Sequence, residues 1–179
     1  MNRPTYRYCP ICRTELTSRE VGGRARQACP AEGCGFVRWD NPIPVVAAIV
    51  ERAGRVVLVR SHGWPEDWYG LVTGFLERGE SPEEAVLREV QEELGIGARH
   101  ERFLGIYPFE RLNQIIFAYH LLGEEGSIRL CEEELADHKE VRIENLRPWP
   151  MGTGPALRDW LASRGYRPPM LQRARPTEP

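Results

Sequence analysis

The sequence contains no apolar run long enough to cross a bilayer. The longest extends from Pro44 to Val50, whereas a membrane-spanning helix needs roughly 20 apolar residues. The first residues, Met1 to Thr5, also lack the apolar core of a secretory signal. We therefore predict a soluble, cytoplasmic protein without a membrane partner.

The chain also has little net charge and no internal repeat. Its 24 Lys and Arg residues and 26 Asp and Glu residues give a formal charge of -2 at pH 7. The charge is uneven, because residues 1–44 carry seven basic and four acidic residues, and the remainder carries 17 and 22. No whole-molecule field favours nucleic acid as a general partner. The 179 residues suffice for one catalytic-sized domain and a small appendage.

Cysteine is scarce and unevenly placed. Four of the five cysteines form two close pairs, Cys9 with Cys12 and Cys29 with Cys34. Without a secretory signal, such pairs are typical of metal ligands rather than disulfides. Two facing turns can present four thiolates to one zinc ion, which leaves no open position for catalysis. A segment this short cannot fold on apolar burial alone, so we predict a small structural zinc ribbon, with four buried free cysteines as the alternative.

A linker follows the cysteine pairs. Asp40–Pro44 contains two prolines, which discourage regular structure. This stretch predicts a ribbon and linker over residues 1–42 and a larger domain over residues 43–163. Residues 164–179 are rich in proline and arginine, and we expect a flexible tail there.

Strands and two helices are predicted in the larger domain. A capping box at Ser81–Glu84, with proline at the first helical position and Gly95 at the end, predicts a helix over 82–94. Apolar residues at helical spacing predict a second helix over 154–163. Strands are predicted by apolar, β-branched runs over 45–50, 56–59, 103–107, 115–122 and within 135–143.

Carboxylates gather on the first of these helices. Glu89 and Glu93 are one turn apart and Glu92 lies beside them, so the three share one face. Like charges this close are destabilising unless a hard cation neutralises them, and oxygen ligands suit Mg²⁺ or Mn²⁺. Arg88 can pair with Glu92, and Gly74 lies in a turn where a carbonyl can approach an ion. A solvated acidic helix face is the alternative.

The spacing of these residues resembles the Nudix box. Its specified positions are occupied here by Gly74, Glu80, Arg88-Glu89-Val90, Glu92-Glu93 and Gly95-Ile96. The flanking strands also resemble that family over residues 43–163. The resemblance implies an α/β fold, an α/β/α sandwich around a mixed sheet, that hydrolyses a nucleoside diphosphate linked to another moiety.

The resemblance also implies roles for the box residues. It makes Glu89 and Glu93 the main ligands of catalytic Mg²⁺ or Mn²⁺, with Glu92 and the Gly74 carbonyl assisting. Glu80 would support the site or reach a metal through water.

A general base must take the proton from the attacking water. In the family this is either a box glutamate, here Glu89, or a carboxylate from a later loop. Glu132, Glu133 and Glu134 occupy such a place, and we favour Glu134 because its position before Leu135 resembles that of the family's acidic residue ahead of the last strand.

Cysteine pairs ahead of a Nudix domain resemble the NADH pyrophosphatases and related proteins that act on ADP-ribose or FAD. That resemblance implies a homodimer. The NADH enzymes carry a Ser-Gln-Pro-Trp-Pro-Phe-Pro type signature after the box, and Tyr107–Gln114 keeps only a proline and an aromatic of it. A second departure is Val72-Thr73, where many members have Pro-Gly. The first departure weighs against NADH as the substrate and leaves hydrolysis intact.

Phe109, Arg111 and Asn113 are candidate substrate-binding residues, for base stacking, phosphate binding and polar recognition. A loop packed for its own sake is the alternative. No histidine shows metal-ligand spacing, and ordinary surface or core roles are expected for His62, His100, His120 and His138.

We therefore predict metal-dependent hydrolysis of the pyrophosphate bond in NADH, ADP-ribose, FAD or a similar dinucleotide. One alternative is the removal of oxidised nucleoside triphosphates, and a capped RNA end is a larger candidate substrate. Another is a non-catalytic regulator that senses nucleotides or binds nucleic acid through ribbon arginines. Retention of every box glutamate weighs against the regulator.

Overall fold

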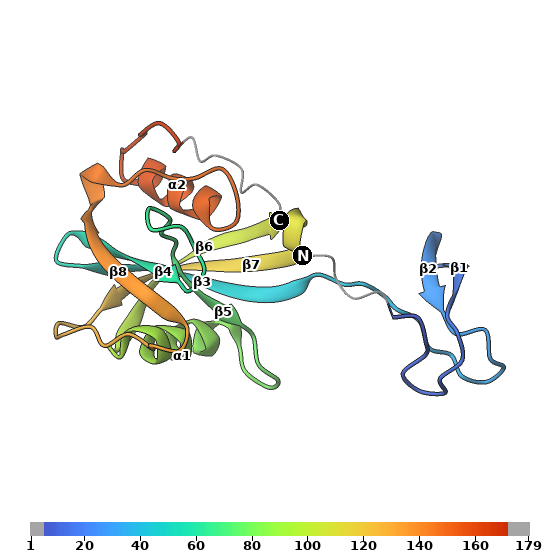
Figure 1. Cartoon of the computed structure of the whole chain (residues 1–179). Coiled ribbons are helices and arrows are strands. Elements are labelled where there is room, and N and C mark those ends of the chain that lie inside the picture. Colours follow the sequence, from blue (N-terminus) through green and yellow to red (C-terminus); the bar gives the residue numbers. More distant parts are fainter. Residues whose placement is uncertain (1–5, 172–179) are drawn as a thin grey trace. The chain divides into compact units, whose positions relative to one another are not determined.

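The chain forms two compact units, Met1–Asn41 and Pro42–Pro179. The computed structural model describes residues 6–171 (Figure 1). Within that range no helix is long and apolar enough to span a membrane.

The first unit contains one antiparallel hairpin, made of β1 (Thr17–Val21) and β2 (Arg24–Ala28). The connecting Gly22-Gly23 has positive φ at both positions, a conformation that favours glycine in tight hairpin turns. The sequence pattern predicted no strand here, because the residues are mostly polar and exposed. The buried centre of the unit is small and consists of Cys9, Leu16 and Cys29.

The second unit is built on a six-stranded mixed sheet. Five strands lie in the order β6-β7-β3-β4-β8, and β5 pairs with β3 off this path. The strand pair β3 and β7 is parallel, and the other pairs are antiparallel. The strands are β3 (Ile43–Arg52), β4 (Arg55–Ser61), β5 (Val72–Phe75), β6 (Ala98–Phe109), β7 (Gln114–Gly123) and β8 (Leu135–Arg142).

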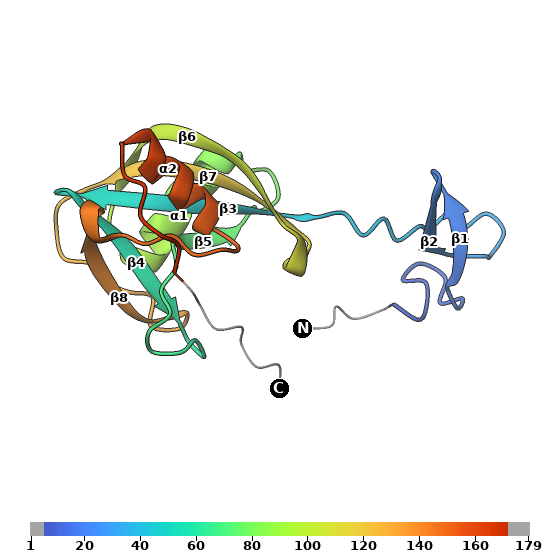
Figure 2. The same cartoon turned by 90° about the horizontal axis from the view of Figure 1, so that it is seen from above.

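Two helices, α1 (Pro82–Leu94) and α2 (Gly154–Ser163), cover opposite faces of this sheet (Figures 1 and 2). Alternate residues of β3 supply both cores, because side chains of a strand point alternately to its two faces. Val46 packs with the α1 residues, and Ile49 packs with the α2 residues. The predicted α/β/α sandwich around a mixed sheet is confirmed.

Local signals determine where α1 begins and ends. The Ser81 side chain accepts a hydrogen bond from the Glu84 backbone, and the Glu84 side chain accepts one from the Ser81 backbone. At the other end Gly95 adopts a left-handed conformation (φ 64°) and donates to the Gln91 carbonyl. The predicted helix over 82–94 therefore has the bounds expected of it.

Two strands differ from the sequence expectation. β6 is longer than residues 103–107, because it is an exposed edge strand with two irregularities in register that hide its alternation. β5 has only four residues, too few for a periodic signal. In the segment expected to be a tail, Leu171 donates a hydrogen bond of 2.8 Å to the Pro148 carbonyl, and residues 172–179 lie outside the described range.

Gly154 provides a test of the packing of α2. A Cβ at this position would lie 1.8 Å from the Trp149 carbonyl oxygen. Alanine normally stabilises a helix by about 1 kcal/mol relative to glycine, but this clash should make Gly154→Ala destabilising by about 1–3 kcal/mol. Urea unfolding checks this, with exposed Arg158→Ala as the control that should change stability by less than about 0.5 kcal/mol. A Gly154→Ala protein as stable as the wild type would show that the loop at Trp149 yields.

Candidate active site

The first part of the site is a close approach between β5 and α1. β5 pairs with β3 so that Gly74 lies opposite Val46. A Cβ at Gly74 would lie 1.8 Å from the Glu89 carboxyl carbon. Only glycine therefore lets this helix carboxylate lie against the strand, which explains why the position takes glycine.

Arg88 links the carboxylates around this contact. Its guanidinium donates two hydrogen bonds to Glu80, of 3.1 and 2.7 Å, and one each of 2.8 Å to Glu89 and Glu92. A fifth, of 3.1 Å, reaches the Phe75 carbonyl. The hydrogen bonds from Arg88 hold the pKa of Glu80 below its usual value. The sequence predicted the pair with Glu92, and the structure adds Glu80 and Glu89.

Glu93 is the least compensated of these carboxylates. Its side chain is 5% exposed, and among the described residues its Oε2 has no hydrogen-bond partner. Burial, followed by the charges of Glu89 and Glu134, raises the pKa of Glu93 to about 8. A buried acceptor of this kind costs about 1–3 kcal/mol when unpaired. The arrangement suits a cation-binding group.

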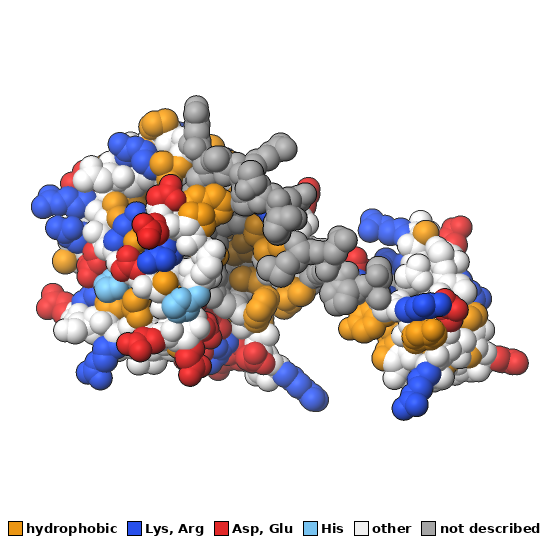
Figure 3. All heavy atoms as spheres, viewed as in Figure 1, with side chains coloured by type: hydrophobic (Ala, Val, Ile, Leu, Met, Phe, Trp, Pro, Cys, Tyr) orange, Lys and Arg blue, Asp and Glu red, His pale blue; other side chains and the backbone are white. Residues whose placement is uncertain are grey.

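Glu89 and Glu92 differ in exposure. Burial raises the pKa of Glu89 despite its hydrogen bond with Arg88, whereas the Glu92 side chain is 58% exposed. Acidic side chains collect on this part of the unit, around α1 (Figure 3). The helix carboxylates do not converge on one point as the cysteines do, because Arg88 draws two of them to itself.

Glu134 lies in the loop between β7 and β8. The backbone N–H groups of Arg129 and Cys131 donate to the carbonyls of Leu94 and Glu93, at 2.9 and 3.1 Å. The loop is therefore attached to the C-terminal end of α1. The charge of Glu134 raises the pKa values of both Glu89 and Glu93, so it lies within electrostatic reach of them.

The candidate substrate residues lie in the β6–β7 connection. Phe109 ends β6, and Arg111 lies in a short 3-10 helix over Glu110–Leu112. Both line a hollow of about 260 Å³. Asn113 adopts a left-handed turn conformation (φ 47°), and its carbonyl accepts a hydrogen bond of 2.9 Å from Ile43. The structure thus brings Phe109 and Arg111 together, whereas the backbone of Asn113 is hydrogen-bonded to β3.

The hollow at Phe109 lies near the end of the sheet where β3 begins, and half of its lining comes from residues 150–155, which lead into α2 on the face opposite α1. Gln114 pairs with Ile43, three residues from the Val46 that pairs with Gly74. A second hollow, of about 420 Å³, involves Glu51 and Arg52 at the other end of β3. It contains none of the predicted site residues, so its size does not make it the better candidate.

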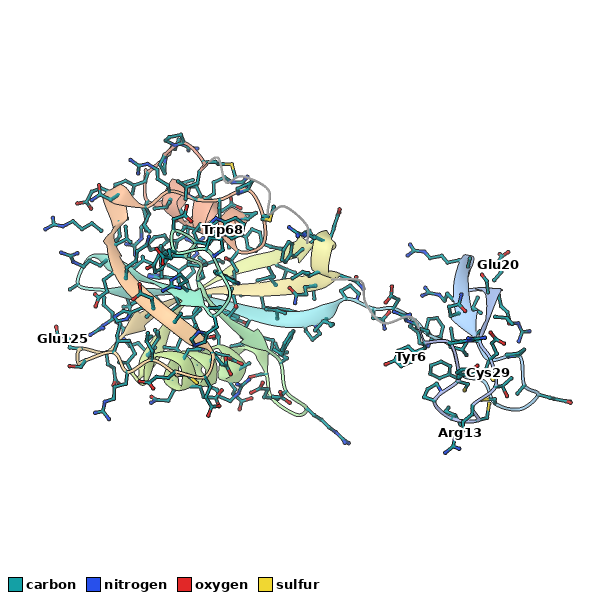
Figure 4. All side chains as sticks on the ribbon, viewed as in Figure 1. Tyr6, Arg13, Glu20, Cys29, Trp68 and Glu125 are labelled. Atoms are coloured by element: carbon teal, nitrogen blue, oxygen red, sulfur yellow. The ribbon has the colours of Figure 1, made fainter. Side chains whose placement is uncertain are left out.

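The four paired cysteines form a separate cluster in the first unit. Figure 4 labels one of them, Cys29. Their sulfur atoms all lie within 4.8 Å of one another, with 3.6 Å between Cys9 and Cys34 and 3.3 Å between Cys12 and Cys29. Hydrogen bonds with Thr14 lower the pKa of Cys12 to about 6, which favours a thiolate. This spacing is compatible with a tetrahedral zinc ribbon.

His62 contacts the loop that carries Glu134, and the sequence pattern did not reveal this contact. Its backbone N–H donates to the Glu134 carbonyl at 3.1 Å, and its ring Nε2 lies 2.9 Å from the Glu132 carbonyl. A lone histidine without metal-ligand spacing carries no signal of such a role.

The raised pKa of Glu93 predicts a pH-dependent stability. The pKa of Glu93 in the folded protein, about 8, lies above its ordinary value of 4.5. Protonated Glu93 is therefore favoured by folding. Its contribution to the free energy of unfolding is fully present below pH 4.5 and is lost as the pH rises through 8. In zinc-loaded protein without Mg²⁺, Glu93→Gln should therefore be more stable than wild type at pH 8–9, by at least about 1 kcal/mol. The difference should shrink at pH 5.

Urea unfolding across this pH range measures the effect. Added Mg²⁺ should stabilise the wild type more than Glu93→Gln, because only the wild type keeps the charge that attracts the cation. Parallel pH profiles for the two proteins would show that Glu93 titrates normally.

This chain resembles known proteins in sequence and in structure. Residues 41–162 match the family model of the NUDIX domain. The chain is 29% identical over 144 residues to the NAD-capped RNA hydrolase NudC of Pseudomonas aeruginosa (strain LESB58), covering 80% of this chain and 50% of that protein. It is 39% identical over 94 residues to the protein of the same name from Mycobacterium bovis (strain BCG / Pasteur 1173P2), covering 52% and 30%.

The chain thus spans about half the length, or less, of the curated relatives it matches. Among solved structures, a NUDIX hydrolase from Nitrosomonas europaea superposes with a TM-score of 0.74 at 20% identity, over 93% of this chain and 97% of that one. This likeness shows the fold. Since the NUDIX match covers well over half of the sequence, the chain belongs to the Nudix family.

Proposed function

We propose that this protein is a Nudix pyrophosphohydrolase that cleaves the pyrophosphate bond of a nucleoside diphosphate linked to another moiety. The observation that carries the proposal is Glu93, a buried carboxylate with an unpaired Oε2 beside Glu89 and near Glu134. A cation bound by these carboxylates would polarise a phosphate group and activate water, which suits the hydrolysis of a pyrophosphate bond.

The donor set fits a hard divalent cation. Carboxylate and carbonyl oxygens suit Mg²⁺ or Mn²⁺. Glu89 and Glu93 would hold the ion, with Glu92 and the Gly74 carbonyl assisting. When bound, the cation neutralises phosphate oxygens and lowers the pKa of the attacking water.

Arg88 and Glu80 would keep the ligands in position. Arg88 is bidentate to Glu80 and also bonded to Glu89 and Glu92, so the loop and helix cannot separate without breaking charge-assisted hydrogen bonds. Ligands held in this way lose little entropy when substrate binds.

Glu134 is the proposed general base, and Glu89 is the alternative. Glu89 is already bonded to Arg88 and packed against Gly74, whereas Glu134 is exposed at the mouth of the site. Glu134 would take the water proton as the water oxygen bonds to phosphorus and the bridging P–O bond breaks. A dinucleotide then yields two phosphate monoesters.

The hollow at Phe109 and Arg111 is the proposed substrate-binding region. An aromatic face can stack on a base, and a guanidinium can bind phosphate. Asn113 would contribute polar recognition. ADP-ribose, FAD and NADH are the candidate dinucleotides, and the names of the relatives favour an NAD-capped RNA end as the second candidate.

We also propose a structural zinc ion held by the four paired cysteines. The very small core of the first unit supports this proposal, because burial alone would stabilise the unit weakly.

We further propose a homodimer and a cytoplasmic location. Light scattering tests the dimer.

Cysteine substitution tests the zinc site. Cys29→Ser should lose the bound zinc, measured as one equivalent per chain, and should remove the dispersed amide signals of the first unit. Cys131→Ser is the matched control, since this half-buried cysteine lies in the second unit and should leave the zinc content unchanged. Full zinc occupancy in Cys29→Ser would contradict a four-thiolate site.

Product analysis tests the reaction. NADH, NAD, ADP-ribose, FAD, diadenosine polyphosphates, nucleotide sugars, 8-oxo-dGTP and NAD-capped RNA are incubated with Mg²⁺ or Mn²⁺, and products are separated by chromatography. We expect metal-dependent cleavage of a dinucleotide or capped end. Glu93→Gln should lower kcat more than about 100-fold, since even residues behind a metal ligand cost 10–100-fold.

Glu125→Gln is the matched control, because it removes a carboxylate from the other hollow and should keep full activity. Preference for 8-oxo-dGTP would favour the oxidised-nucleotide alternative. Nucleotide binding without cleavage of any compound would favour the regulator.

A further inference from the structure

The loop that carries Glu134 is held from two sides. On one side, its backbone N–H groups at Arg129 and Cys131 donate to the end of α1. On the other side lies His62, the first residue after β4. The bonds to α1 are main-chain bonds, which no side-chain substitution removes, whereas the His62 ring bond depends on one side chain.

His62 contacts the loop at two points that flank residue 133. The backbone N–H donates to the Glu134 carbonyl at 3.1 Å, and ring Nε2 lies 2.9 Å from the Glu132 carbonyl. Because a carbonyl only accepts, the ring nitrogen must be the donor. Together the bonds restrict the 132–133 and 134–135 peptide planes, the second of which directly follows Glu134, and with them the direction of the Glu134 side chain.

A change of strand register occurs at the same place. Arg60 pairs with Asp137, but the next residue, Ser61, pairs with Leu135. Such irregularities re-aim the side chains next to them. Glu134 directly precedes Leu135, so its direction depends on contacts beyond the regular ladder, and His62 supplies two of them.

We propose that His62 is a positioning residue that aims Glu134 at the helix carboxylates. The inference rests on the proposed role of Glu134 as general base. These two positions of contact, the carbonyls of Glu132 and Glu134, belong to the loop backbone, and His62 therefore acts through Glu134. A carboxylate misplaced by about 1 Å can cost up to about 100-fold in rate.

Three substitutions of His62 separate positioning from other effects. His62→Ala should lower kcat about tenfold or more, with KM little changed, because the base is displaced while substrate groups remain. His62→Gln should restore most of kcat, since its amide nitrogen can take the place of Nε2. His62→Asn, which is shorter, should not.

His100→Ala is the matched control. The His100 ring Nε2 lies 3.0 Å from the Glu83 carbonyl, so it offers the same kind of bond at a place away from the loop. This variant should keep its kcat. Melting temperatures of all variants show whether a loss of rate comes from unfolding.

A double-mutant cycle tests whether His62 acts through Glu134. In a Glu134→Gln background, His62→Ala should cause no further loss of kcat. A further loss of the full tenfold would overturn the inference, because His62 would then act independently of the base.

Hydrogen exchange of metal-free protein gives a readout that needs no activity. His62→Ala should speed amide exchange in residues 131–135, and His62→Gln should slow it again. Unchanged exchange would overturn the contact itself.

The outcomes also separate this inference from the proposed function. If the wild type cleaves substrate and His62→Ala is equally active, the inference is wrong and the proposed function stands. If the wild type cleaves nothing in the panel, the proposed function fails, and the catalytic part of this inference fails with it.

Discussion

The acidic site depends on the Arg88 guanidinium. Three carboxylates, Glu80, Glu89 and Glu92, accept hydrogen bonds from it, and a strand carbonyl at Phe75 accepts another. Like charges this close would repel one another without a shared cation. A planar donor with a fixed fork can hold them in one arrangement, which a lysine ammonium could not do. Loop, helix and strand are thereby joined at one point.

Arg88 does not compensate the charge of Glu93, and the proposed function rests on this carboxylate. Glu93 is buried, its Oε2 has no hydrogen-bond partner among residues 6–171, and Glu89 and Glu134 add negative charge around it. The protein carries this electrostatic cost in the absence of a cation, and a divalent ion would relieve it. Stability and metal affinity are therefore opposed at this residue, as is common where a site is organised for binding.

The two units offer different donor atoms, and the metals we propose for them differ accordingly. The first unit offers sulfur from four cysteines, which suits zinc, and the second offers oxygen, which suits magnesium or manganese. The four thiolates leave no open coordination position, and so a metal there would stabilise the unit and would not react. The proposed structural and catalytic ions would therefore differ in donor chemistry.

Features that depend on neighbouring residues could be predicted from the chain: the capping box that starts α1, the glycine that ends it, the spacing of the Nudix box and the paired cysteines. Each of these acts within a few residues, and so its pattern is visible in the chain. The hydrogen bonds of Arg88 to Glu80, the nearness of the Glu134 charge to Glu93 and the hydrogen bonds of His62 to the loop arise only in the folded chain. Those contacts depend on which strands pair and in which register, because sheet pairing joins segments far apart in the chain. Short or exposed strands such as β5 and β6 were missed or shortened for the same reason, since their partners and not their own periodicity define them.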